Sequence, residues 1–362
     1  MNLIFDNIIY SLQKSGGGSV YWTELLKRFE KYSENKVLYY EQSGEINNIF
    51  RKSLKLTKVK TETFLNLPIR RYLNFTKPIT EKSIFHSSYF RISASKNAVN
   101  ITTIHDFTTE KFRTGIARRV NLLQKKHAVM NSAGIICISE NTKKDLLHFI
   151  PKVDPGKIIV IYNGVSDDFF KISEEFNISE QDAKFLSLEN EKYLLYIGHR
   201  TDYKNFPLAL KAAAIVKDKY KLVIVGEPLT ADETVMTNQY LGSNYLQISK
   251  LDNEKLNLLY NKAFALLYPS SYEGFGIPLV EAMKTHCPVI ASKNSSIPEV
   301  VGDGGIVLEN CDADSIAEKI VALEDIEFRN KLVAAGVLQS KKFNWDQTYM
   351  QYLEFYKKVF NE

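Results

Sequence analysis

Short apolar runs alternate with amphipathic stretches along most of the chain. Polar or glycine-containing segments bound each run, which is typical of strands buried in a parallel sheet. In the first half these runs lie at 3–12, 83–86, 99–104, 134–139 and 157–165. Helical spacing of apolar residues follows the first run, from Ser19 to about Phe29, and resumes after Ser139 or Asn141, either of which can cap a helix. This alternation predicts an α/β fold.

The same alternation resumes after a polar stretch. Residues 164–191 show no sustained periodicity, and we expect a linker there. Predicted strands then lie at 192–197, 221–226, 244–249 and 263–269. Predicted helices begin near Phe206, with Pro207 in the first turn, and near Ile277, and further helices lie at 312–324, 327–340 and 344–360. The pattern predicts two doubly wound domains, 1–163 and 192–343.

Length and composition are compatible with two such domains. The chain has 362 residues, of which 44% are hydrophobic and 25% are charged, so it can bury a sizeable core. No apolar run approaches the ~18 residues that a membrane span requires, and the first residues lack the basic region and cleavage site of a signal peptide. Cys137, Cys287 and Cys311 are too few and too scattered for a disulfide framework or a zinc site. We therefore expect a cytoplasmic protein.

Charge is distributed unevenly along the chain. Residues 1–163 carry 26 Lys and Arg against 13 Asp and Glu, a net charge of +13, whereas the remainder carries −8 within an overall +5. Basic stretches lie at 51–71 and 111–129, and the second has the spacing of a cationic amphipathic helix. The asymmetry indicates an anionic partner, either a membrane surface or a phosphorylated substrate. We expect no nucleic acid, because no binding motif accompanies the charge; a solvated face remains an alternative for 51–71.

Tyr272–Met283, with the sequence YEGFGIPLVEAM, concentrates the candidate chemistry. Gly274 and Gly276 allow a ligand to approach the backbone closely, and Pro278 suits the first turn of the predicted helix. The unpaired N–H groups at a helix start after an apolar strand form an anion site. Glu273 and Glu281 lie eight positions apart. Taken singly, a glycine turn and a glutamate that complements the helix dipole are simpler explanations.

The whole string is more specific than its parts. It resembles the E-x7-E motif of retaining glycosyltransferases with the two-domain GT-B fold, specifically those of family 4. The resemblance continues through PVIASKNSSIPEVVGDGGIVL at 288–308. The resemblance covers essentially the whole chain and is strongest from 157 to 308. It implies two Rossmann-like domains facing a cleft: 1–163 would bind the acceptor and 192–343 the nucleotide-sugar donor. A terminal helix within 344–362 would pack back on the first domain.

The resemblance also implies roles for individual residues of the second domain. Arg200 and Lys204, in the string GHRTDYKN, would grip the donor diphosphate. Glu273 would hold sugar hydroxyls and Glu281 the ribose hydroxyls. The full set of implied donor-binding residues is Gly198, Arg200, Lys204, Lys250, Leu251, Glu273, Gly274, Phe275, Gly276, Ile277 and Glu281.

In the first domain the implied site residues follow two predicted strands. A loop containing Gly17 and Gly18 follows the first strand and would face the donor phosphate. His105 and Asp106 follow the strand at 99–104, and His105 matches a family histidine that approaches the donor sugar. His86, at the end of the strand at 83–86, is equally compatible with a functional and a structural role.

The resemblance implies a metal-independent hexosyltransferase that retains anomeric configuration. A GDP- or UDP-linked sugar would pass to a hydroxyl of a glycan or lipid-linked acceptor in bacterial surface polysaccharide synthesis (O-antigen, capsule or lipopolysaccharide). The departing diphosphate would accept the proton of the acceptor, at the inner face of the cytoplasmic membrane. A nucleotide-sugar 2-epimerase of GT-B fold and a non-catalytic nucleotide-sugar-binding subunit remain alternatives. An NAD-dependent oxidoreductase is disfavoured, because no G-x-G-x-x-G follows any predicted strand.

Overall fold

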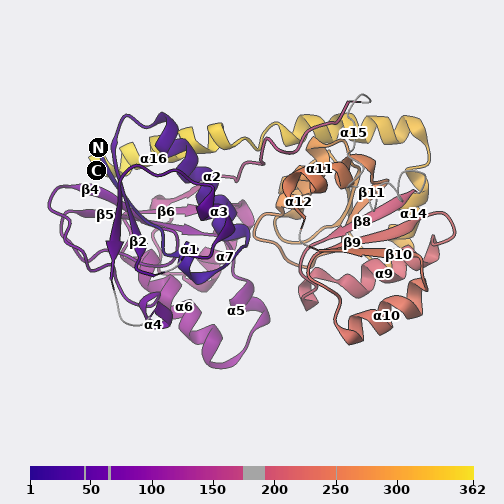
Figure 1. The fold of residues 1–362 in the computed structure, drawn as a ribbon, viewed down its shortest axis with the longest axis horizontal. Coiled ribbons are helices and arrows are strands. Elements are labelled where there is room, and N and C mark those ends of the chain that lie inside the picture. The colour runs from indigo at the N-terminus through magenta and orange to yellow at the C-terminus, as the bar shows by residue number, and fades with distance from the viewer. Residues whose placement is uncertain (45, 64–66, 174–191, 250) are drawn as a thin grey trace. The chain divides into compact units, whose positions relative to one another are not determined.

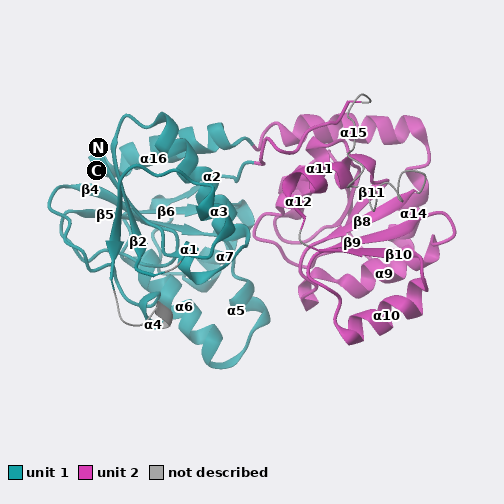
Figure 2. Ribbon diagram, viewed as in Figure 1, with its two compact units in different colours: residues 1–164, 344–362 teal, residues 165–343 magenta. Residues whose placement is uncertain are grey.

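Two parallel sheets, in separate units, form the framework of the chain (Figures 1 and 2). The computed structural model describes residues 1–44, 46–63, 67–173, 192–249 and 251–362. The first unit comprises Met1–Gly164 and Asn344–Glu362, and the second comprises Val165–Phe343. Residues 165–173 of the predicted linker therefore belong to the second unit, and 174–191 lie outside the described residues.

The first unit is built on a parallel sheet with the strand order β3-β2-β1-β4-β5-β6-β7. The strands are β1 (Asn2–Asp6), β2 (Lys36–Gln42), β3 (Val59–Glu62), β4 (Ser83–Ser87), β5 (Ala98–Ile104), β6 (Gly134–Cys137) and β7 (Ile158–Val160). The chain runs outward from β1 to β3 and then returns through β4, so this is a doubly wound sheet. The apolar pattern predicted neither β2 nor β3, and β3 is an edge strand that exposes most of its side chains.

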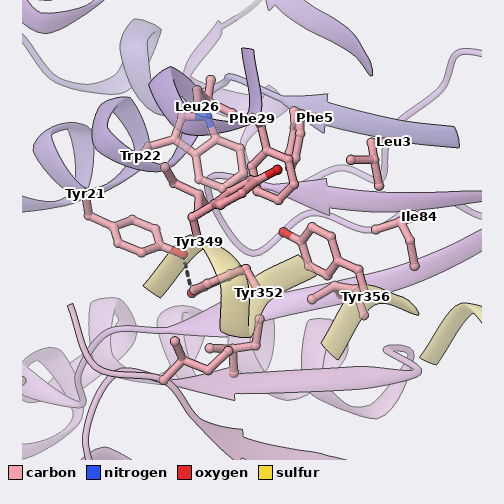
Figure 3. Close-up of a cluster of buried hydrophobic side chains, with 14 of the residues drawn as sticks. Leu3, Phe5, Tyr21, Trp22, Leu26, Phe29, Ile84, Tyr349, Tyr352 and Tyr356 are labelled. Carbon is pink, nitrogen blue, oxygen red and sulfur yellow. Dashed lines mark hydrogen bonds between the residues drawn. The ribbon is translucent and has the colours of Figure 1, made fainter. Parts of the chain in front are cut away.

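Helices cover the sheet. They are α1 (Ile9–Leu12), α2 (Gly17–Tyr32), α3 (Ile49–Lys52), α4 (Leu67–Arg70), α5 (Thr108–Phe112), α6 (Gly115–Met130), α7 (Glu140–Phe149) and α16 (Trp345–Asn361). The C-terminal helix α16 shares the main core with α2. Figure 3 shows aromatic side chains of α2 and α16 packed together in this core. Ser139 caps α7, as one of the two predicted caps.

The prediction of a single strand at 3–12 is wrong. β1 ends at Asp6, and the residues after Ile8 form α1. The cause is Asn7, whose buried side chain accepts a hydrogen bond from Trp22 Nε1 (2.8 Å) and donates one to Glu41 Oε1 (3.1 Å). These bonds hold the chain away from the strand direction, so the apolar residues that follow reach the core from a helical turn.

The predicted loop at Gln13–Gly18 is also shorter in the structure. α2 begins at Gly17 rather than Ser19, so Gly17 and Gly18 lie in its first turn. Gly16 precedes the helix with a φ of +149°, a value that residues with a Cβ rarely adopt.

The two basic stretches take different structures. Residues 111–129 are divided between α5 and α6 at Gly115, whose φ is +72°. Residues 51–71 run from α3 through β3 to α4, and 64–66 lie outside the described residues. In the described parts of the chain, no helix combines the length and apolarity needed to cross a membrane.

The second unit contains another doubly wound parallel sheet, with the order β10-β9-β8-β11-β12-β13. Its strands are β8 (Tyr193–Ile197), β9 (Lys221–Val225), β10 (Tyr245–Ile248), β11 (Ala265–Tyr268), β12 (Val289–Ser292) and β13 (Ile306–Leu308). Its helices are α9 (Phe206–Ile215), α10 (Ala231–Leu241), α11 (Asn253–Lys262), α12 (Ile277–Lys284), α13 (Ile297–Val301), α14 (Ala313–Ala322) and α15 (Ile326–Ser340). The prediction of two doubly wound α/β sheets is thus confirmed.

We predict that Gly134→Ala destabilises the first unit, because α16 packs directly on this position. A Cβ at Gly134 would lie 2.7 Å from Phe355 Cζ and 2.9 Å from Ile101 Cδ1. Overpacking of this kind costs about 1–3 kcal/mol. Urea unfolding followed by circular dichroism should show the loss, and adding Phe355→Leu should recover part of it, because the ring that causes the clash is removed. Unchanged stability of Gly134→Ala would contradict this packing.

Candidate active site

Two glycines bring together the carboxyl ends of β8 and β9. Gly198 follows β8 with a φ of +124°, and Gly226 follows β9 with a φ of +156°. A Cβ on Gly226 would lie 2.6 Å from the carbonyl oxygen of Gly198 and 3.3 Å from Nη1 of Arg200. The absence of side chains therefore lets the loop after β8 fold over this edge of the sheet. Ligands of open parallel sheets bind at this edge.

Arg200 lies in that loop with its guanidinium almost fully buried. Its side chain is 5% exposed, and its Nε lies 3.0 Å from Glu233 Oε1 on α10. Its Nη2 donates to the carbonyl of Pro228 at 2.9 Å. Nη1 is buried and has no hydrogen-bond partner among the described residues. A buried cation with an unused donor is suited to bind an anion, which would satisfy both needs.

Lys204 meets Glu273 across 69 positions of sequence. Its Nζ lies 2.6 Å from Glu273 Oε1 and 3.4 Å from the hydroxyl of Tyr268. β8 and β11 are neighbouring strands, and the chain reverses its direction of winding between them. The pair therefore lies at the topological switch point of the sheet, which is where open α/β sheets bind ligands.

Hydrogen bonds between loops hold this pair in place. Asn205, with a left-handed φ of +50°, donates from Nδ2 to the carbonyl of Pro269 at 2.9 Å. The Ser271 N–H donates to the carbonyl of Tyr203 at 2.7 Å. The loop after β8 and the loop after β11 are thus joined on both sides of Lys204.

The glycine-containing segment before α12 has the conformation that its sequence predicts. Gly276 caps α12 with a φ of +99°, and Pro278 lies in the first turn. The hydroxyl of Ser296 donates to the carbonyls of Glu273 (2.9 Å) and Phe275 (3.0 Å). Two carbonyl oxygens are thereby engaged, while the positive end of the α12 dipole faces the loop that contains Gly274.

Glu281 lies in α12 one turn after Ile277. Its half-buried carboxylate accepts a hydrogen bond from the Tyr260 hydroxyl at 2.8 Å. Burial raises the pKa of Glu281 to about 7, although the Tyr260 hydrogen bond acts in the opposite direction. The carboxylate is therefore divided between its protonated and ionised forms near neutral pH.

Of the implied donor-binding residues Lys250 and Leu251, only Leu251 is described. Leu251 is half-buried between β10 and α11, whereas Lys250 lies outside the described residues. Within the described residues, no group of three or more His, Cys, Asp or Glu side chains is placed to hold a metal ion.

His105 and Asp106 lie in the first unit, directly after β5. The ring of Tyr21 packs edge-on against His105 at 4.6 Å. Burial lowers the pKa of His105 to about 4, so the imidazole is neutral at pH 7. The charge of Asp106 opposes this shift, and the charge of Lys125 adds to it by a smaller amount. Asp106 Oδ1 accepts the N–H of Thr108 at 2.9 Å, and this bond shapes the turn after His105. Gly17 and Gly18 belong to the same unit, in the first turn of α2.

His86 is a core residue. It is fully buried, and its ring nitrogens bond to the hydroxyls of Tyr356 (2.5 Å) and Thr103 (3.0 Å). Burial lowers its pKa to about 3. Of the two histidines at predicted strand ends, His105 is therefore the one with access to solvent.

Sequence patterns missed Glu233 and Tyr260. Glu233 is recognisable as the N3 residue of a capping box with Thr230, but nothing in that pattern pairs it with Arg200. Tyr260 has the sequence signature of an apolar helix position, and it is indeed a buried residue of α11. The contacts of both residues depend on how separate helices pack.

Comparisons with known proteins identify the family of this chain. The family model for glycosyl transferases group 1 matches residues 177–337, and that for Glycosyltransferase Family 4 matches residues 15–169. The O-antigen chain mannosyltransferase B of Escherichia coli is 30% identical over 270 residues, which cover 71% of this chain and 70% of that protein. The O-antigen chain mannosyltransferase RfbU of Salmonella typhimurium is 28% identical over 229 residues, 62% of this chain and 60% of that protein.

A solved structure shows the same fold over the full length. The crystal structure of Anabaena Alr3699/HepE in complex with UDP-glucose superimposes with a TM-score of 0.75, covering 99% of this chain and 100% of that chain at 16% sequence identity. The two parallel sheets of this chain make both of its units Rossmann-like. From the family models and the relatives together, this chain belongs to the group 1 glycosyltransferases of GT-B fold.

Proposed function

We propose that the protein transfers a hexose, with retention of configuration, from a GDP- or UDP-linked sugar to a hydroxyl of a glycan or lipid-linked acceptor. The observation that carries this proposal is the salt bridge between Lys204 and Glu273 at the switch point. Lys204 lies in the same loop as Arg200, whose guanidinium is buried. The O-antigen mannosyltransferases among the relatives support a role in bacterial surface polysaccharide synthesis. The UDP-glucose complex of the Anabaena structure supports a nucleotide-sugar donor.

The chemistry makes particular demands on these side chains. Cleavage of the bond between sugar and diphosphate leaves negative charge on the β-phosphate. Arg200 would bind that charge through its unused Nη1, and Lys204 would share its ammonium between Glu273 and the phosphate. The departing diphosphate would accept the proton of the acceptor hydroxyl, so no protein nucleophile is required. The N-terminus of α12 would add backbone donors.

The remaining candidates would bind the neutral parts of the donor. Glu273 would accept hydrogen bonds from the sugar hydroxyls, and Glu281 would accept hydrogen bonds from the ribose hydroxyls. His105, being neutral at pH 7, would donate one hydrogen bond to the sugar rather than act as a general acid. Gly17 and Gly18 would allow the diphosphate to approach the first turn of α2.

We further propose that the first unit contacts an anionic membrane, at the inner face of the cytoplasmic membrane, through one surface. All residues from 111 to 120 are exposed, and Ile116, Val120 and Leu123 follow one face of α6. Gln124 donates to the carbonyl of Arg71, and this contact places the segment after α4 beside α6. The α6 surface comprises the exposed apolar residues Ile69, Tyr72, Leu73, Ile116, Val120 and Leu123 and the exposed cations Arg113, Arg119 and Lys126.

This composition suits a lipid surface. Ile116 is 80% exposed and Leu123 is 64% exposed, which is costly in water and favourable at the boundary between headgroups and acyl chains. The flanking cations would face anionic headgroups. The net charge of +13 over residues 1–163 has the same sign.

Lys204→Ala and Glu281→Gln should impair the enzyme in different ways. A thermal-shift panel of GDP- and UDP-sugars first identifies the donor, and release of nucleoside diphosphate then gives kcat and KM. Lys204→Ala should lower kcat/KM by about 10²-fold, with much of the loss in kcat, because Lys204 meets charge that grows during reaction. Glu281→Gln should mainly weaken nucleotide binding, because the ribose that Glu281 would contact is the same in the ground state and in the transition state.

A matched control is Lys219→Ala, which removes another lysine paired with a glutamate, Glu324, at 3.0 Å. Near-normal kcat in Lys204→Ala, or equal losses in Lys204→Ala and Lys219→Ala, would refute the proposed role. Conversion of the donor to an epimer without acceptor would instead identify a 2-epimerase.

Activity should persist in excess chelator, because Arg200 and Lys204 supply the positive charge that a divalent cation would otherwise provide. The measurement is the rate of nucleoside diphosphate release with and without chelator. A rate that falls to background and returns with manganese or magnesium would contradict this prediction.

Vesicle binding should depend on both parts of the α6 surface. Sedimentation with anionic vesicles should be strong at low salt and weaken at high salt, because screening shortens the reach of the cations. Ile116→Ser/Leu123→Ser and Arg119→Ser/Lys126→Ser should each reduce binding several-fold. Val235→Ser/Leu338→Ser is the control, since these residues of the second unit are similarly exposed, at 67% and 65%. Equal binding by all variants would disprove the assignment of this surface.

A further inference from the structure

Tyr260 is a buried side chain whose hydroxyl is aimed at one of the candidate site residues. It lies on α11 and is 0% exposed. Its hydroxyl donates to Glu281 Oε2 at 2.8 Å, and its ring packs edge-on against Phe169 at 5.8 Å. Asp252 caps α11 by accepting the N–H of Lys255 at 2.9 Å, so the helix that carries Tyr260 has a defined start. The phenol is thus held both by the contact of its ring with Phe169 and by its place on α11.

The hydrogen bond has a defined direction. Burial and the neighbouring Glu281 carboxylate raise the pKa of the Tyr260 phenol well above its ordinary value, so it remains a donor at every pH at which the protein would be assayed. Among the described residues, no other side chain donates to this carboxylate. One oxygen is therefore occupied by the phenol, and Oε1 remains for a ligand hydroxyl.

We propose that Tyr260 is a positioning residue: its hydroxyl orients the Glu281 carboxylate and stabilises its charged form, so that the carboxylate can accept the hydroxyl groups of a nucleotide ribose. This inference rests on the proposed function, since it assigns a partner to the proposed ribose-binding residue. An ionised carboxylate accepts hydrogen bonds at both oxygens, whereas a protonated one uses one oxygen as a donor. The Tyr260 hydroxyl favours the form that binds.

The surroundings of Glu281 make this single hydrogen bond important. Burial and the Tyr260 hydroxyl are the two influences on its pKa, and no charged side chain of the described parts of β11, α13 or α15 contributes. Tyr268 from β11 and Cys287 after α12 lie nearby, and burial raises the pKa of each, so both are neutral at pH 7. Within the described residues, no cation therefore supports the charge on Glu281.

The direction of the pH dependence follows from this arrangement. Burial holds the pKa of Glu281 near 7, so the ionised fraction rises as the pH rises through neutrality. Without the Tyr260 hydroxyl the charged form loses a donor and the pKa moves higher. A rise of about one unit would lower the ionised fraction at pH 7 about fivefold and leave it nearly unchanged at pH 9.

The test is calorimetric titration of the full chain with GDP and with UDP between pH 6 and pH 9. Tyr260→Phe keeps the ring and its contact with Phe169, and circular dichroism checks the fold. We expect Tyr260→Phe to bind the nucleotide about fivefold more weakly than the parent at pH 7 and within about twofold at pH 9. The ratio of the two affinities cancels the ionisation of the nucleotide itself. Glu281→Gln should bind weakly at every pH, with a ratio to the parent that worsens as the pH rises.

Tyr220→Phe is the matched control, because it removes a tyrosine hydroxyl that donates to another glutamate, Glu324, at 3.0 Å. Its affinity should equal that of the parent at every pH. A Tyr260→Phe ratio that does not vary with pH, whether near one or uniformly reduced, would overturn the positioning role and leave Tyr260 as a packing residue. If the parent binds neither GDP nor UDP, or if Glu281→Gln binds as the parent does, the proposed function fails instead. If Tyr260→Phe does not fold, the Glu281→Gln ratio decides instead. A ratio that is constant with pH overturns the inference, because the ionisation of Glu281 then has no effect on binding. A ratio that worsens as the pH rises supports it.

Discussion

The salt bridge between Lys204 and Glu273 is the contact on which the candidate site of the second unit depends. It joins the loop after β8 to the loop after β11 at the point where the sheet reverses its winding. Each charge makes the burial of the other tolerable, because an unpaired ion would keep its full desolvation cost. A diphosphate would enter as a third member of this pair and share the lysine. The same contact thus joins the two loops, and under the proposed function it would also place the lysine for the anion.

Two other candidate site residues of the second unit are also held by side chains from neighbouring helices. Arg200 is held by Glu233 from α10, and Glu281 is held by Tyr260 from α11. These partners restrict the rotamers of the groups that would meet the donor, which lowers the entropy cost of binding and fixes the direction of each hydrogen bond. Arg200 and Glu281 are therefore each supported from a different helix, α10 and α11.

In the first unit the C-terminal helix takes part in the same kind of support. The hydroxyl of Tyr352, on α16, bonds to that of Tyr21 at 2.5 Å (Figure 3), and the ring of Tyr21 packs against His105. The last residues of the chain thus help to place a candidate site residue that follows β5. His86 is bonded to Thr103 and Tyr356 in the same region, which shows why its position at a strand end did not make it accessible.

Apolar periodicity and glycine positions were sufficient to predict two doubly wound units and many of the element positions, because burial of strands and the φ demands of turns act over a few residues. They did not predict β2 or β3. They did not determine that Asn7 ends β1, that Lys204 pairs with Glu273, or that Tyr260 supports Glu281. Those outcomes join side chains on elements far apart in the chain. Only the packing of separate helices and strands decides which polar groups meet, since a buried polar group is satisfied by whichever partner the fold brings within reach.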